Sequence, residues 1–112
     1  MVLWVFDKNI LLVYKTNMKS ALIRHDKITD ELGNTVEITL WKVPQTSDKP
    51  QGYKYSLVYI VDGKRVIGYD NSERKGDHHH YGDAEEPYGF TTLRQLTDDF
   101  LNDVEQIKRN LV

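Results

Sequence analysis

An Asp-Gly pair between two runs of strand-forming residues most constrains the fold of this chain. Tyr53–Val61 and Lys64–Tyr69 are rich in β-branched and aromatic residues, and Asp62-Gly63 separates them. This dipeptide favours the two-residue type I′ turn, whose twist matches that of antiparallel strands. The segment therefore predicts a β-hairpin.

The length of the turn also predicts which residues face each other. With a two-residue loop, Tyr55 faces Asp70 and Lys54 faces Asn71. This register places Lys54 and Tyr55 beside the first residues of the histidine-rich stretch that follows. A slip by one residue would turn both side chains to the other face of the sheet.

Two more strands are expected before this hairpin. Ala21–Ile28 leads through Gly33-Asn34, which supplies the positive-φ residues of a turn, into Val36–Val43. In the second of these runs apolar and polar residues alternate, which is typical of a half-buried strand. Pro44 has no N–H to donate and ends the pairing, and the polar residues up to Gly52 predict a surface loop.

The C-terminal region has the pattern of an amphipathic helix. Thr92-Leu93-Arg94-Gln95 has the form of a capping box. Apolar residues follow at spacings of three or four and form one stripe: Leu93, Leu96, Phe100, Val104, Ile107 and Leu111. The predicted architecture is α+β, an antiparallel meander of about four strands with this helix packed on it.

The first 17 residues allow two interpretations. The apolar runs Val2–Phe6 and Ile10–Tyr14 flank a polar break at Asp7-Lys8-Asn9. They lack the leading positive charge and the cleavage site of a signal peptide and are too short to span a bilayer. We expect residues 1–17 to be an extension upstream of a start at Met18 or an additional hairpin, and residues 18–112 to form a single domain.

Composition limits the classes of function. The chain has no cysteine, which excludes disulfides, thiol nucleophiles and Cys-based zinc sites and suits the cytoplasm. Its formal net charge is −2, so that contact with a polyanion would have to be made by a local basic patch. We expect a cytoplasmic protein without a membrane segment; the sequence leaves open whether it is a monomer or a homodimer.

Most of the titratable chemistry lies in one stretch, YDNSERKGDHHHYGDAEEPYGF, from Tyr69 to Phe90. It holds three of the four histidines and six carboxylates, and we expect an irregular loop because no helix or strand pattern runs through it. A charged loop of this kind is often only a solvated surface. Its length and its four aromatic residues, Tyr69, Tyr81, Tyr88 and Phe90, argue for more than that.

A metal site is one interpretation of this stretch. Side chains of an extended segment alternate in direction, so that His78 and His80 can share a side while His79 faces away. Two imidazoles and a carboxylate can hold zinc or a similar ion, with carboxylates available from Asp70, Asp77, Glu85 and Glu86. The spacing matches no established metal signature, and we expect neither a metal nor another cofactor.

Acid–base chemistry is the interpretation that we favour. Histidine can take and give a proton near neutral pH, and RNA can be cleaved without metal by a base, an acid and cations that hold the phosphate. The predicted catalytic residues are His78 and His80, with Tyr69 as a proton relay and Asp70 and Asp77 as carboxylates that orient the imidazoles. The predicted substrate-binding residues are Lys54, Tyr55, Asn71, Arg74 and Lys75.

Several segments resemble a known family. VEITLWKVP (36–44), YKYSLVYIVDGKRVIGYDN (53–71), KGDHHHYGDAEEPYGF (75–90) and LTDDFLNDV (96–104) are similar, in this order, to the TumE toxins of bacterial and archaeal toxin–antitoxin pairs. The resemblance begins near Met18. Its motif positions here are Tyr69, Asp70, Asn71, Lys75, Gly76, Asp77, His78, His80, Glu85, Glu86, Pro87 and Tyr88.

The resemblance implies a cytoplasmic toxin that a helix-turn-helix antitoxin binds and neutralises. It supplies no catalytic mechanism. From the residues we expect a small, metal-independent endoribonuclease with RNA as its substrate. Two alternatives stay open: a metal-dependent nuclease that uses the Asp/His stretch, and a non-enzymatic module that binds an antitoxin or another protein through the sheet edge and the acidic loop.

Overall fold

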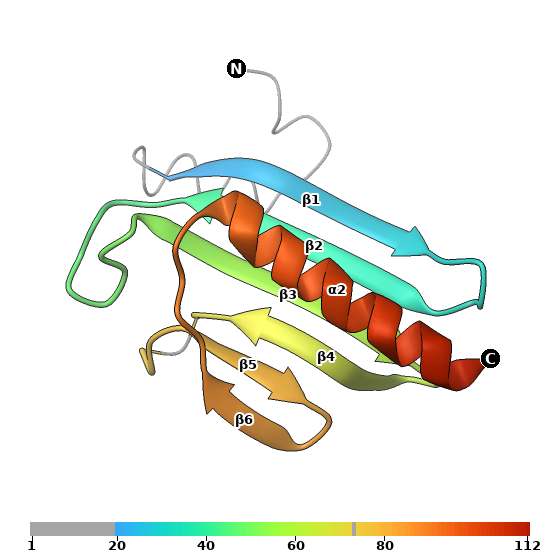
Figure 1. Ribbon diagram of the computed structural model, residues 1–112. Helices are drawn as coiled ribbons and strands as arrows, with labels where there is room; N and C mark the ends of the chain where they lie inside the picture. Colours follow the sequence, from blue (N-terminus) through green and yellow to red (C-terminus); the bar gives the residue numbers. More distant parts are fainter. Residues whose placement is uncertain (1–19, 73) are drawn as a thin grey trace.

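The computed structural model describes residues 20–72 and 74–112. In this part of the chain, six strands form one antiparallel sheet in sequential order, and one helix packs on it (Figure 1). The α+β class is therefore confirmed. The elements are β1 (Ala21–Thr29), β2 (Thr35–Lys42), β3 (Tyr53–Val61), β4 (Lys64–Asp70), β5 (His78–Tyr81), β6 (Ala84–Pro87) and α2 (Leu93–Leu111).

The prediction of about four strands was too low, because the histidine-rich stretch is not an irregular loop. Its central part is a second hairpin, in which β5 pairs with β4 on one side and with β6 on the other. Gly82 takes a left-handed φ of 58° in the turn between β5 and β6. Strands of histidine and glutamate show no apolar alternation, which is why the sequence pattern did not reveal them. The hairpin expected within residues 1–17 lies outside the described residues.

The predicted turn between β3 and β4 is confirmed, but the predicted register is wrong. Asp62 and Gly63 both have positive φ, 51° and 76°, as a type I′ turn requires. Beyond it, the register shifts by one residue because Val66 has no partner and forms a β-bulge. Asp70 consequently faces Ser56.

The bulge changes the neighbours of Lys54 and Tyr55. The predicted pairs Tyr55–Asp70 and Lys54–Asn71 do not form. The side chain of Asn71 instead accepts a hydrogen bond from the backbone N–H of Tyr55 at 3.0 Å. Asn71 thus extends the β3–β4 pairing with its amide group.

Helix α2 covers one face of the sheet and closes the core. Thr92 caps it by accepting a hydrogen bond from the backbone N–H of Gln95, while the Gln95 side chain donates to Asp99 rather than completing a capping box. The central residues of the predicted stripe are buried and its last residue, Leu111, is exposed. The core consists of Ile38, Leu40, Tyr55, Leu57, Tyr59, Ile67, Tyr69, Leu96, Phe100 and Val104.

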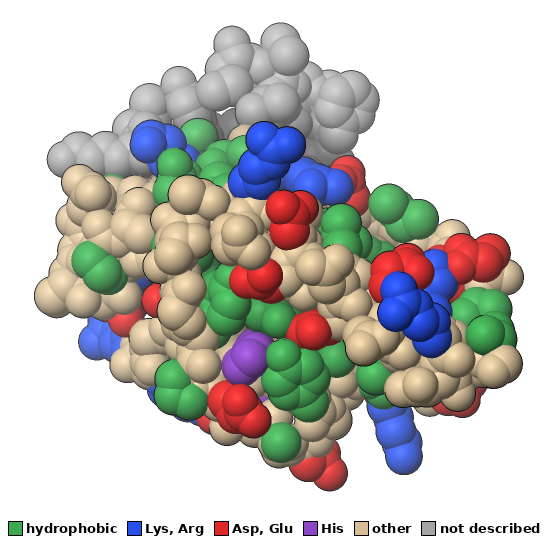
Figure 2. Space-filling view, in the orientation of Figure 1, with side chains coloured by type: hydrophobic (Ala, Val, Ile, Leu, Met, Phe, Trp, Pro, Cys, Tyr) green, Lys and Arg blue, Asp and Glu red, His purple; other side chains and the backbone are tan. Residues whose placement is uncertain are grey.

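Strand register divides the remaining side chains between two faces. Tyr69 and Leu57 are paired and lie in the core under α2. Their neighbours along each strand point away from the helix, to a side that we call the back face. Across β3 to β5, the back face carries Lys54, Ser56, Val58, Gly68, Asp70, His78 and His80. Figure 2 shows the opposite, helix side, where only a small area of histidine is visible.

Candidate functional site

The back face brings together two histidines and two carboxylates from three neighbouring strands. Register places His78 opposite Asp70 and His80 opposite Glu85. The side chains of directly opposed residues in antiparallel strands lie on the same face. Asp70, His78, His80 and Glu85 therefore form one group, which we call the Asp–His cluster.

The reactive atoms of the cluster point toward one another. Nε2 of His78 lies 2.9 Å from Oδ1 of Asp70 and 3.2 Å from Oε2 of Glu85. Nε2 of His80 lies 3.2 Å from Oδ2 of Asp70 and 3.5 Å from the same Glu85 oxygen. The two imidazole rings are 4.9 Å apart and nearly perpendicular. The four side chains thus surround a single point.

A backbone carbonyl fixes the orientation of His78. Its Nδ1 lies 3.1 Å from the carbonyl oxygen of Gly76, which can only accept a hydrogen bond. Nδ1 therefore carries a proton, and Nε2 faces the cluster with a lone pair when the ring is neutral and with an N–H when it is protonated.

The cluster is enclosed on one side and open on the other. His78 and His80 are 5% and 8% exposed. The side chain of Glu85, on the edge strand β6, is 38% exposed. Glu85 is therefore the member of the cluster that is most accessible to solvent.

Two cationic side chains lie beside the cluster, and a third lies on the same face of the sheet. Nζ of Lys75 is 3.7 Å from Oε1 of Glu85. Arg65 lies over Gly68, where a Cβ atom would come within 2.8 Å of its Cδ and 3.4 Å of a ring carbon of His80. Lys54 is exposed on the back face, on the strand that also carries Ser56, the partner of Asp70. These cations can attract a phosphate toward the cluster.

Of the ten predicted site residues, the described structure brings His78, His80 and Asp70 together, with Lys75 beside them and Lys54 on the same face of the sheet. Tyr69 lies on the other face. It neighbours Asp70 in β4 and therefore points to the helix, where its hydroxyl donates to Asp103 of α2. Burial and this hydrogen bond raise its pKa far above the ordinary value. A proton relay from Tyr69 to the histidines is excluded by this placement.

Asp77 and Tyr55 bind each other on the helix side, away from the cluster. The Tyr55 hydroxyl donates to Oδ2 of Asp77 at 2.6 Å, and the Gln51 side-chain amide donates to the same oxygen at 2.8 Å. Burial, together with the Asp77 carboxylate, strongly raises the pKa of Tyr55. This contact fastens the start of β5 to the sheet.

Asn71 is also structural. It is almost fully buried, and its side chain bonds to the backbone of Tyr53 and Tyr55. Its backbone carbonyl oxygen accepts a hydrogen bond from Nζ of the buried Lys49 at 2.8 Å. The polar loop between β2 and β3, predicted to be only a surface connection, is therefore anchored against the end of β4.

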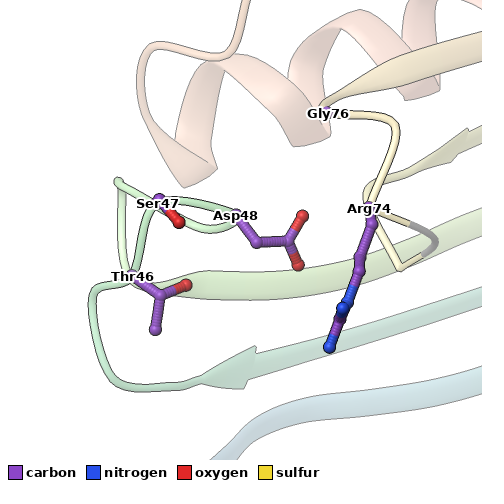
Figure 3. A pocket seen from close by; sticks show the side chains of 5 residues that line it. All are labelled: Thr46, Ser47, Asp48, Arg74 and Gly76. Carbon is purple, nitrogen blue, oxygen red and sulfur yellow. The ribbon is translucent and has the colours of Figure 1, made fainter.

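Arg74 lies beside that loop rather than beside the histidines. Together with Thr46, Ser47, Asp48 and Gly76 it lines an open hollow. Figure 3 shows Arg74 extending from the β4–β5 connection, with the Asp48 side chain between it and Thr46. Arg74 does not belong to the Asp–His cluster, and it could contact only a ligand long enough to extend from the cluster to this hollow.

His79 faces the helix side, as strand alternation predicts. Its ring lies 5.2 Å from that of Tyr69, and its Nδ1 is 3.1 Å from the hydroxyl oxygen of Tyr81. Because it shares β5 with His78 and His80 but not their face, it provides a matched control for them.

The predicted catalytic and substrate-binding residues include neither Arg65 nor Glu85, which the sequence indicated only as a possible metal ligand and a family motif position. Glu85 could have been found from the β5–β6 pairing, which a Gly-Asp turn after the histidines permits. Arg65 lies beside His80 because Gly68 has no side chain and because the bulge at Val66 places Gly68 on the back face, which Arg65 shares. No local sequence signal reveals that contact.

A family model described as "Toxin TumE" matches residues 5–108 of this chain. The chain belongs to the TumE toxin family. The match begins inside the 1–17 segment, and the boundary expected near Met18 stays a prediction. Searches of curated proteins and of solved structures gave no match. In the described residues, no helix has the length and apolar character needed to cross a membrane.

Proposed function

We propose that this TumE toxin acts on RNA as an endoribonuclease and that the Asp–His cluster is its reactive centre. The observation that carries the proposal is the convergence of His78 and His80 on shared carboxylates, at a partly open place flanked by cations. Ionisable side chains gathered in this way are typical of catalytic sites.

The reaction that we propose is attack of the ribose 2′-oxygen on the adjacent phosphorus. A base takes the 2′-hydroxyl proton, the O2′–P bond forms, the P–O5′ bond breaks, and an acid returns a proton to O5′. Cations stabilise the additional negative charge on the phosphoryl oxygens. Lys75, beside Glu85, is the candidate for that last role, with Arg65 on the other side of the cluster.

In this proposal the two histidines depend on each other for activity. The Nε2 atoms of both rings face the same carboxylate, that of Asp70, whereas a separate base and acid would face opposite sides of the phosphorus. We therefore expect the loss of either ring to remove most of the activity, because the remaining ring no longer has its partner.

We further propose that the protein works in the cytoplasm, where RNA is its substrate and a helix-turn-helix antitoxin neutralises it. Strand β6 supports the choice of a basic partner. All four of its residues are exposed, and it carries Glu85 and Glu86 at the edge of the sheet. An acidic edge complements a DNA-binding protein.

The test is growth arrest on expression, with the variants His78→Ala and His80→Ala compared with His79→Gln. We expect the wild type and His79→Gln to arrest growth and to cleave cellular RNA, and both alanine variants to lose this effect while folding normally by circular dichroism. Folded alanine variants that remain fully toxic would contradict the assignment. A wild type that binds an antitoxin but neither arrests growth nor cleaves RNA would favour the non-enzymatic binding module.

A further inference from the structure

We propose that Asp70, His78 and His80 bind one divalent transition-metal ion, with Glu85 at the open side of the site. The ion is of the class that accepts imidazole together with carboxylate, with Zn²⁺ as the first candidate and Mn²⁺, which favours the carboxylate oxygens, as the second, rather than Mg²⁺. The ion's place in RNA cleavage rests on the function proposed above, but the binding site rests on geometry alone. This proposal of a bound ion differs from the expectation from the sequence, which was RNA cleavage without a metal.

The first argument is the spacing of the donor atoms. One donor each from Asp70, His78 and His80 lie within 4.8 Å of one another. The four nitrogen–oxygen distances within the whole cluster run from 2.9 to 3.5 Å. Ligand bonds of about 2.0–2.2 Å place neighbouring ligands of a tetrahedral ion roughly 3.4 Å apart. A single ion fits among these atoms with little rearrangement.

The second argument is the direction of the His78 lone pair. Because Nδ1 donates its proton to the Gly76 carbonyl, Nε2 of the neutral ring faces carboxylate oxygens at 2.9 and 3.2 Å. A lone pair and two carboxylates repel each other unless a proton or a cation lies between them. A backbone carbonyl that fixes the outer ring nitrogen is also the usual support of a metal-binding histidine.

The third argument is charge and access. The carboxylates of Asp70 and Glu85 match the charge of one divalent ion when both imidazoles are neutral. The histidines are buried while Glu85 is partly exposed, which leaves an accessible side for water or a phosphate oxygen. Catalytic zinc sites have three protein ligands and an open fourth position; here Asp70, His78 and His80 supply the three ligands, and Glu85 lies at the open side. Such an ion supplies Lewis acidity toward a phosphoryl oxygen.

The test uses the full chain, stripped of metal, and measures binding of ZnCl₂, MnCl₂ and MgCl₂ by calorimetry and by the shift of the unfolding midpoint. We expect one Zn²⁺ or Mn²⁺ per chain, a raised midpoint, and no binding of Mg²⁺ at the same concentration. The variants are His80→Gln and Glu85→Gln; the controls are His79→Gln and the exposed His25→Gln. Affinity should fall by about 10- to 100-fold in Glu85→Gln, more in His80→Gln, and stay unchanged in the controls.

Glu85→Gln keeps the test valid if His80→Gln fails to fold, because the Glu85 side chain is partly exposed. A wild type that binds neither Zn²⁺ nor Mn²⁺, or cluster variants that bind as tightly as the controls, would overturn the site. Undiminished RNA cleavage by the stripped protein would overturn the ion's role and leave the ribonuclease intact. Stoichiometric binding to a protein without RNA cleavage would support the site and contradict the proposed ribonuclease.

Discussion

Asp70 lies directly opposite His78 across the β4–β5 pair, and its Oδ1 atom is 2.9 Å from Nε2 of that ring. The other oxygen of the same carboxylate lies 3.2 Å from Nε2 of His80. Asp70, at the end of β4, therefore contacts both His78 and His80. Because it contacts both rings, Asp70 is the residue whose change tests the cluster as a unit.

The variant Tyr55→Phe separates a structural role from a catalytic one. It removes the hydrogen bond to Asp77, and we expect the free energy of unfolding to fall by about 1–2 kcal/mol while RNA cleavage per folded molecule is retained. Chemical denaturation and a cleavage assay at a temperature where the variant is folded check this. The control is Tyr53→Phe on the same strand, whose ring packs on Phe90 at 6.1 Å. A stable Tyr55→Phe that no longer cleaves RNA would restore Tyr55 to the site.

Tyrosine ionisation should make the fold sensitive to alkaline pH. Burial, and then a hydrogen bond to a carboxylate, raises the pKa of Tyr55, Tyr69 and Tyr88 above the ordinary value of 10.0 for a tyrosine. Since the raised pKa means that the folded state favours the neutral ring, stability is fully present below pH 10 and falls as the pH rises above it.

An absorbance titration at 295 nm, followed together with circular dichroism, measures this effect. We expect these tyrosines to ionise only when the secondary structure is lost. Ionisation of all tyrosines near pH 10 in a protein that is still folded would contradict the buried hydrogen bonds to Asp77, Asp99 and Asp103.

The variant Gly68→Ala tests the position of Arg65. An added Cβ would come within 2.8 Å of Cδ of Arg65, and the arginine side chain must move away from His80. Because that side chain is flexible, we expect the free energy of unfolding to change by less than about 1 kcal/mol and the RNA cleavage rate to fall several-fold. Arg65→Ala should reproduce the loss. Full activity in both variants would remove Arg65 from the site.

Lys75 should act through the phosphate backbone. Lys75→Ala is expected to weaken RNA binding and to lower the slope of log affinity against log salt concentration by about 0.7, the value for one contact with a single strand. Filter binding at several salt concentrations measures the slope, with the catalytically impaired His80→Ala background preventing cleavage. Lys27→Ala, on the opposite edge strand β1, should leave the slope unchanged. If Lys75→Ala has the same slope as the protein that keeps Lys75, then Lys75 does not contact the phosphate.

The sequence was sufficient for the parts of the fold that follow from local periodicity. The Asp62-Gly63 turn, strands β1 to β4 and the helix from Leu93 were predicted within a residue or two, because their apolar patterns are strong. The bulge at Val66 was not predictable, since it depends on how two strands pair rather than on either strand alone. It shifted the partner of Asp70 from Tyr55 to Ser56.

The site was predicted in part because strand alternation holds for polar residues as well. It separates His78 and His80 from His79, and the same rule separates Tyr69 from Asp70 and Lys54 from Tyr55. Tyr69 and Asp70 were both predicted to lie in the site, and so were Lys54 and Tyr55. Neighbouring residues of a strand point to opposite faces of the sheet, so only one residue of each pair can face the cluster. Glu85 required knowledge of the β5–β6 pairing, and Asp77 faces the helix side because Tyr55 and Gln51 bind it.

The most direct test of the ribonuclease proposal is cleavage of a defined RNA by purified wild-type protein and by Asp70→Asn. The substitution keeps the size of the side chain but removes the negative charge of the carboxylate that both histidines contact. We predict that the wild type cleaves the RNA and that the rate falls by at least about 100-fold in Asp70→Asn, with His25→Gln unchanged. A folded Asp70→Asn protein that cleaves RNA as fast as the wild type would contradict the Asp–His cluster as the reactive centre.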